Sequence, residues 1–210
     1  MPENRGTPAA NDTLLFPARA AVRVAADLPL PREHVEECLH EDGDALFRRA
    51  WSDGLDALTA AERRGRLSTH TGFIAESVAT LLLADVGLDV FAQIVTPGVH
   101  GVDLLALAPE GSVLALEIKG TLRASSIPRF SRGDLRQMSI EWLNDPSNPA
   151  MAEWDLEALD IYGGVAVIDF ARNVWRVALT SDHEGFRPVV DIEQLRALSV
   201  RRQIHLPFKA

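Results

Sequence analysis

Residues 101–119 constrain the fold more than any other segment, because they have the pattern of a β-hairpin. Two strand-like runs, 101–107 and 112–119, flank a five-residue turn over 108–112. This turn pairs Leu107 with Val113. One face of the predicted hairpin is then wholly apolar and must cover a core, through Leu104, Ala106, Leu114, Leu116 and Ile118. The other face is apolar only toward the turn, at Leu105, Leu107, Val113 and Ala115.

Counting outward from the turn places Asp103 opposite Glu117, and Lys119 shares their face. Cross-strand neighbours lie ~5 Å apart at the side-chain root, and like charges directly opposite each other are destabilising. A divalent cation would compensate them, since Mg²⁺ typically takes one or two carboxylates, waters and a substrate phosphate. A lysine beside the ion can serve an attacking water or neutralise a phosphate oxygen. A structural salt bridge from Lys119 to Glu117 or Asp103 is the alternative interpretation.

The flanking segments predict an α/β order of helix, three strands, helix and two strands. Apolar spacing indicates a mostly buried helix over roughly 70–86, in which Glu76 is the only charge before Asp85. Such a carboxylate faces either solvent or a site that needs it. A strand over 88–95 precedes the hairpin, and strands over 165–170 and 174–179 come later. Between them a second amphipathic helix is predicted from the spacing of Leu135, Met138, Ser139, Trp142 and Leu143.

Charge is distributed unevenly along the chain. The net charge of −9 argues against a general nucleic-acid coat protein. Residues 67–117 nevertheless hold six acids and no base, and they run into a basic strip over 118–136, whose bases are Lys119, Arg123, Arg129, Arg132 and Arg136. The strip either contacts phosphates or is a solvated loop. Only two of the 21 basic residues are lysines, and one stands at 119, where a compact ammonium with a tuneable pKa would be wanted.

Glu76 in the leading helix, then Asp103, then Glu117-Ile118-Lys119 resembles the PD-(D/E)XK, or restriction-endonuclease-like, nuclease superfamily. Three further motifs resemble nuclease domains of bacterial polymorphic and contact-dependent inhibition toxins. They are Gly101-Val102-Asp103, the Glu-x-Lys-Gly end of the next strand, and Gln137-Met138-Ser139 followed by Trp142. The resemblance covers residues 76–142, about a third of the chain.

The resemblance implies a mixed β-sheet core flanked by helices, and a role for each matched residue. Asp103 and Glu117 would bind Mg²⁺ or Mn²⁺ together with the carbonyl of Ile118, and Lys119 would serve the attacking water. Glu76 would reach the metal through water, and Gln137 would assist from the second helix. We expect the strip to bind nucleic acid through Arg123, Arg129, Arg132 and Arg136.

The function expected is a divalent-metal-dependent nuclease, with DNA favoured over RNA, acting as a bacterial toxin effector with a cognate immunity protein. Alternatives are an inactive nuclease-fold module that binds nucleic acid or a partner protein, and an interaction protein that uses its helical arm. Two units are expected: an extended segment and helical arm over 1–66, with a strand-like stretch at 20–25, and the nuclease domain over 67–210. The apolar runs are too short to span a membrane and no secretory signal precedes them, so a cytoplasmic location, or delivery into a target cell, is expected.

Overall fold

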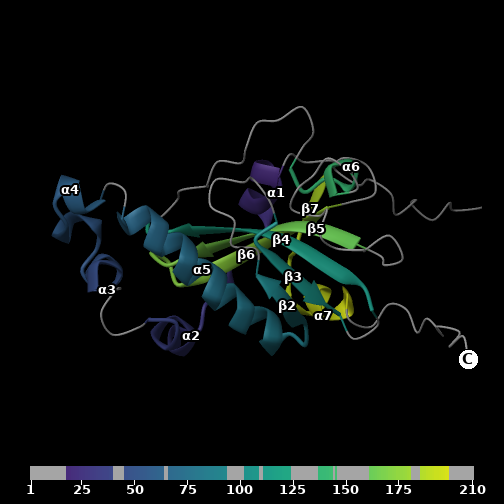
Figure 1. The fold of residues 1–210 in the computed structure, drawn as a ribbon, viewed down its shortest axis with the longest axis horizontal. Coiled ribbons are helices and arrows are strands. Elements are labelled where there is room, and N and C mark those ends of the chain that lie inside the picture. Colours follow the sequence, from purple (N-terminus) through teal and green to yellow (C-terminus); the bar gives the residue numbers. More distant parts are fainter. Residues whose placement is uncertain are drawn as a thin grey trace, which may run out of the picture.

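A computed structural model describes residues 18–39, 45–63, 66–93, 102–108, 111–123, 137–143, 145, 161–180 and 185–198. In this part of the chain a mixed sheet of seven strands is flanked by helices (Figure 1). The strands are β1 Leu28–Pro29, β2 Asp89–Gln93, β3 Leu104–Leu107, β4 Val113–Thr121, β5 Ile161–Asp169, β6 Val174–Thr180 and β7 Phe186–Pro188. The helices are α1 Ala18–Val24, α2 Arg32–Glu37, α3 Ala45–Ser52, α4 Ala60–Arg63, α5 Arg66–Asp85, α6 Ile140–Leu143 and α7 Ile192–Leu198, with a 3₁₀ turn at Leu55–Ala57.

The strand order is β1-β6-β5-β4-β3-β2, and β7 also pairs with β6. Neighbours are antiparallel except for the central pair, β4 and β5, which runs parallel. Parallel neighbours need a long crossover, and here the crossover carries α6. The chain therefore leaves the end of β4, passes α6, and returns to begin β5 beside the start of β4.

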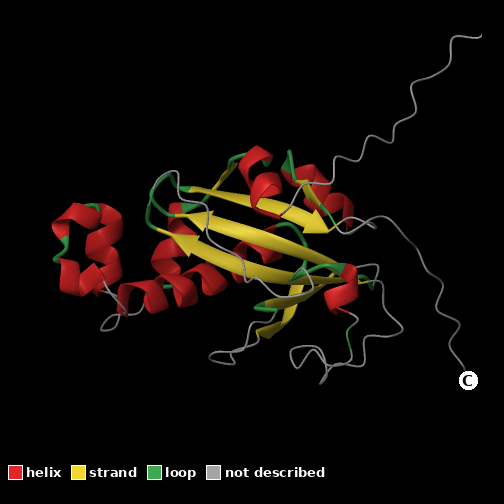
Figure 2. Ribbon diagram, turned by 90° about the horizontal axis from the view of Figure 1, so that it is seen from above, coloured by secondary structure: helices red, strands yellow, loops and turns green. Residues whose placement is uncertain are grey.

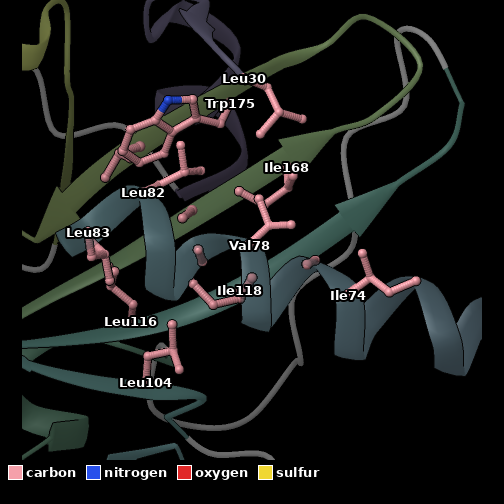
Figure 3. Close-up of a cluster of buried hydrophobic side chains, with 14 of the residues drawn as sticks. Leu30, Ile74, Val78, Leu82, Leu83, Leu104, Leu116, Ile118, Ile168 and Trp175 are labelled. Atoms are coloured by element: carbon pink, nitrogen blue, oxygen red, sulfur yellow. The ribbon is translucent and has the colours of Figure 1, made fainter. Parts of the chain in front are cut away.

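Each face of the sheet is covered by its own hydrophobic cluster. The twenty-residue helix α5 lies along one face, where Ile74, Val78 and Leu82 pack on side chains of the central strands (Figure 3). The other face is covered by Ala21 and Val22 of α1 and by Met138 and Leu143 at α6. In Figure 2, α3 and α4 project beyond the sheet next to the start of α5. The result is a layered α/β architecture with both sheet faces buried.

The structure confirms the predicted hairpin register over Leu104–Leu107, whereas the ladder does not extend to the predicted pair of Asp103 and Glu117. Leu107 pairs with Val113 and Leu104 with Leu116. The predicted core face packs against α5, and the opposite face contributes Leu105, Val113 and Ala115 to the second cluster. The helix predicted over 70–86 is α5, which begins earlier, at Arg66. The strands predicted at 88–95, 165–170 and 174–179 correspond to β2, β5 and β6.

Two predictions of local structure are wrong. The strand-like stretch at 20–25 lies in α1, because Ala-rich sequence favours a helix and the sheet buries Ala21 and Val22 on one side of it. The second amphipathic helix does not include 137–139. Those residues form a turn in which Met138 has φ 66°, and the helix covers only Ile140–Leu143 among the described residues. Leu135 and the rest of that predicted helix fall outside the described residues. No helix of the described chain is long and apolar enough to cross a bilayer.

Candidate metal centre

The site forms where β3 separates from β4. The two strands pair over Leu104–Leu107, but β4 continues beyond them to Thr121. Asp103, just before β3, departs from this register: its backbone N–H donates to the carbonyl of Leu116 at 2.8 Å, although Leu116 pairs with Leu104. Its side chain then replaces the missing strand, since Oδ2 accepts a hydrogen bond from the backbone N–H of Ile118 at 2.6 Å. Asp103 is therefore held firmly against the exposed edge of β4.

Glu117 lies close enough to Asp103 for its charge to raise the pKa of that carboxyl, and it is almost completely buried, with 5% of its side chain exposed. Both of its carboxylate oxygens accept a hydrogen bond. The ammonium of Lys119 contacts Oε1, and the side-chain amide of Gln137 donates to Oε2 at 2.6 Å. A carboxylate so buried needs such partners to offset its lost hydration. Lys119 itself keeps 28% of its side chain exposed and remains accessible from solvent.

Glu76 reaches the same site from α5. Its Oε2 accepts a hydrogen bond from Nε2 of Gln93, at the end of β2, at 3.1 Å. Burial raises the pKa of Glu76, while the Gln93 hydrogen bond and the charge of Lys119 lower it. The close approach of α5 to β4 is possible because residue 120 is glycine. A Cβ there would lie 2.6 Å from the carbonyl oxygen of Thr71 and 2.8 Å from Cβ of Ala75.

Electrostatics at the site leave negative charge uncompensated. Burial, followed by the charge of Glu117, raises the pKa of Asp103 from 3.8 to about 7, and the charge of Glu76 adds to the effect. The Ile118 hydrogen bond and the Lys119 ammonium oppose this shift without cancelling it. Additional positive charge near Asp103 would lower the free energy of ionising its carboxyl. A divalent cation between Asp103 and Glu117 would supply that charge.

The oxygen donors at this point suit Mg²⁺ or Mn²⁺. Among the described residues, no three His, Cys, Asp or Glu side chains lie close enough together to ligate one ion. An ion here would thus use the two carboxylates and complete its shell with other oxygens, as Mg²⁺ commonly does. Ile118 offers one of these, because the N–H and C=O of a strand residue point to the same side and its N–H points to Asp103. The residues present therefore fit a hard divalent cation.

The structure brings together five residues singled out from the sequence: Glu76, Asp103, Glu117, Lys119 and Gln137. One prediction about them is wrong in detail. Gln137 acts from the turn before α6 and not from a helix, because the left-handed backbone of Met138 interrupts the helical path. Trp142 and Leu143 pack in or against the second cluster, as predicted for core residues.

The structure describes less of the predicted nucleic-acid surface. Arg123 is exposed just after β4, close in sequence to Lys119. Arg129, Arg132 and Arg136 lie outside the described residues, so their predicted phosphate contacts stay predictions.

Sequence reasoning missed two residues that shape the site, Gln93 and Gly163, and it assigned no packing role to Gly120 of the Glu-x-Lys-Gly motif. Gln93 holds Glu76, and the two glycines admit α5 and the 137–139 turn close to the central strands. Glycine within a buried strand is a usable signal, since it often marks a close approach of another backbone. The role of Gln93 has no such signal in the sequence.

No protein-family model matches this chain, and no curated protein is similar to it in sequence. The resemblance to nucleases therefore rests on the motif residues and the geometry around them.

Proposed function

We propose that this chain is a divalent-metal-dependent nuclease with a restriction-endonuclease-like core, and that it hydrolyses phosphodiester bonds in nucleic acid. The observation that carries the proposal is the convergence of Asp103, Glu117 and Lys119 where β3 separates from β4. Two neighbouring carboxylates with a lysine beside them suit a metal ion and a phosphate together. The layered α/β arrangement around a mixed sheet is consistent with such a core.

Each residue of the site has a role in this proposal. Asp103, Glu117 and the carbonyl of Ile118 would hold Mg²⁺ or Mn²⁺, with Glu76 bound through water. When bound, the ion would polarise the phosphate and lower the pKa of the attacking water. Lys119 orients that water and neutralises charge that develops on a phosphate oxygen. Gln137 keeps Glu117 in position through its hydrogen bond to Oε2.

The substrate and the biological setting rest on the resemblance alone. DNA is proposed ahead of RNA as the substrate. The toxin-like motifs support a role as a bacterial effector, held in check by a cognate immunity protein. Contact with the phosphate backbone is assigned to the basic strip, of which Arg123 is the described and exposed member.

The proposed activity is tested by incubating purified protein with plasmid, single-stranded DNA and tRNA in Mg²⁺, Mn²⁺ or EDTA. We expect cleavage only with a divalent ion, and loss of it in Glu117→Gln. Asp89→Asn, which removes an exposed carboxylate on β2, serves as the matched control and should cleave normally. Cleavage that persists in EDTA would exclude the metal mechanism. A folded protein that cleaves none of the substrates would favour the inactive binding module.

A further inference from the structure

The turn over residues 137–139 carries Gln137 to Glu117 and begins α6. Ser139 caps the helix, since its carbonyl accepts from the N–H of Leu143 at 2.9 Å and its Oγ accepts from the N–H of Trp142 at 3.1 Å. Gln137 and Ser139 are both buried. Met138 connects these two buried residues, so its backbone conformation sets where they lie relative to each other.

Met138 has an unusual backbone conformation for its residue type. Its φ of 66° lies in the left-handed region, which a side chain with a Cβ occupies only at a cost. Its side chain is completely buried in the second cluster, on the sheet face that also carries Glu117. A strained conformation persists only where the surroundings determine it, and such residues concentrate at functional sites. Packing on β5 supplies this constraint.

Gly163 is the point on β5 against which the turn packs. A Cβ at this position would overlap the carbonyl oxygen of Met138 and Oγ1 of Thr180, and it would lie 2.9 Å from Cδ1 of Leu143. Glycine is thus the residue that allows the Met138 carbonyl to lie directly on the strand. Gly164, the next residue, faces the opposite cluster, where a Cβ would meet side chains of Leu116 and Leu179.

We propose that Met138 and Gly163 are positioning residues that act through Gln137. Their contact fixes the left-handed turn, the turn aims the Gln137 amide at Oε2 of Glu117, and that hydrogen bond orients the carboxylate. The consequence for metal binding rests on the proposed function, whereas the placement of Gln137 does not. Outer-sphere groups of this kind typically change metal affinity ~10- to 100-fold when they are lost.

The placement is tested by the NMR signals of the Gln137 side-chain amide in ¹⁵N-labelled protein, assigned by their disappearance in Gln137→Leu. A bond to a buried carboxylate shifts one amide proton away from the range of solvated glutamines. We expect Gly163→Ala to return this proton to that range and Gly164→Ala, its matched control, to leave it in place. An unchanged Gln137 signal in folded Gly163→Ala would overturn the proposal.

A second pair of variants avoids adding any atom to the crowded strand. Leucine and isoleucine have the same size, but isoleucine is β-branched and fits poorly at positive φ. Met138→Leu should keep the shifted Gln137 signal and Met138→Ile should lose it. Identical spectra for the two variants would contradict the proposal.

Calorimetric titration with Mg²⁺ alone distinguishes the positioning role of Met138 and Gly163 from the proposed metal-dependent function. Wild type and Gly164→Ala should bind equally, and Gly163→Ala at least ~10-fold more weakly. If wild type binds no Mg²⁺, the proposed function fails, and the amide signals still decide the role of Met138 and Gly163. Equal Mg²⁺ affinity in Gly163→Ala and wild type would overturn the positioning role.

Discussion

At the scale of single residues, the balance of charge around Glu117 decides what the site can do. Its two oxygens are held by Lys119 and Gln137, while Asp103 beside it carries a pKa raised to about 7. Lys119 is one of two lysines in a chain whose other basic residues are arginines. An ammonium can approach a water or a phosphate oxygen as a point charge, which a planar guanidinium cannot do.

Lys119→Arg should therefore leave folding almost intact and abolish most turnover. Arginine keeps the charge, so an ion pair with Glu117 would survive, but it stays protonated at all relevant pH values. Loss of a positioned group of this kind typically costs ~10² to 10⁴ in rate. Single-turnover cleavage and a thermal melt measure the two effects, with Arg63→Lys on α4 as the control. Near wild-type cleavage by Lys119→Arg would reduce Lys119 to a structural cation.

The raised pKa of Asp103 predicts a pH-dependent stability. Between pH 4 and 7 the folded state keeps a proton on Asp103 that the unfolded chain loses, so without metal this group's contribution to stability falls as pH rises from about 4 to about 7. Asn cannot ionise and still offers an oxygen to the Ile118 N–H. Asp103→Asn should thus melt at a higher temperature than wild type at pH 8 without metal, and at about the same temperature at pH 4.

Thermal melts of both proteins across this pH range, with and without Mg²⁺, measure the effect. Titrating groups remote from Asp103 are common to the two proteins and cancel in the difference, which therefore reports on Asp103 and the charged groups beside it. Mg²⁺ at pH 8 should stabilise wild type more than Asp103→Asn, because binding to the folded state adds stability that increases with affinity. A difference in melting temperature that does not vary with pH would show that Asp103 titrates normally.

At the scale of elements, the helices and strands that could be predicted are those long enough to show a regular spacing of apolar residues. The register of the paired hairpin residues was predictable from the alternation of side chains, because a slip of one residue would turn the apolar side chains of one strand to the other face. Helix α5 was predictable from the spacing of its apolar residues. Short elements were not. The two-residue strand β1 and the three-residue strand β7 form only by pairing with β6. Helix α1 contains valines, which are common in strands, so its sequence resembled a strand.

The basic strip yields a prediction about the segment that connects β4 to α6. If Arg129, Arg132 and Arg136 contact phosphates, replacing all three with Ala weakens binding to every sequence alike. Each lost contact also reduces the slope of the logarithm of the binding constant against the logarithm of salt concentration by about 1. Binding of a labelled duplex by Glu117→Gln, measured between low and moderate salt, checks this. An unchanged salt slope in the triple variant would make the strip a solvated face.

At the scale of the whole molecule, the site lies where both helical layers reach the edge of β4. Glu76 comes from α5 on one face, and Gln137 comes from the turn before α6 on the other. The hairpin residues of the site were predictable because neighbouring strands determine them. The residues that reach the site from the helical layers were less predictable. The apolar spacing of the helix marked Glu76 as unusual, but its hydrogen bond from Gln93 and the left-handed turn at Met138 depend on tertiary packing.

The net charge of −9 also has a consequence at this scale. A chain so acidic repels nucleic acid except where basic residues and a bound cation gather. In the proposed function, a metal ion at Asp103 and Glu117 would therefore serve both the chemistry and the approach of the substrate.

Calorimetric titration of Mg²⁺ or Mn²⁺ into the wild-type chain at pH 8 tests whether the proposed metal centre binds an ion. The proposed metal centre should bind one ion per chain, with a loss of affinity of at least ~10-fold in Asp103→Asn and in Glu117→Gln and no change in the surface control Asp89→Asn. Absence of binding by the folded wild type, or equal affinity in all four proteins, would contradict it.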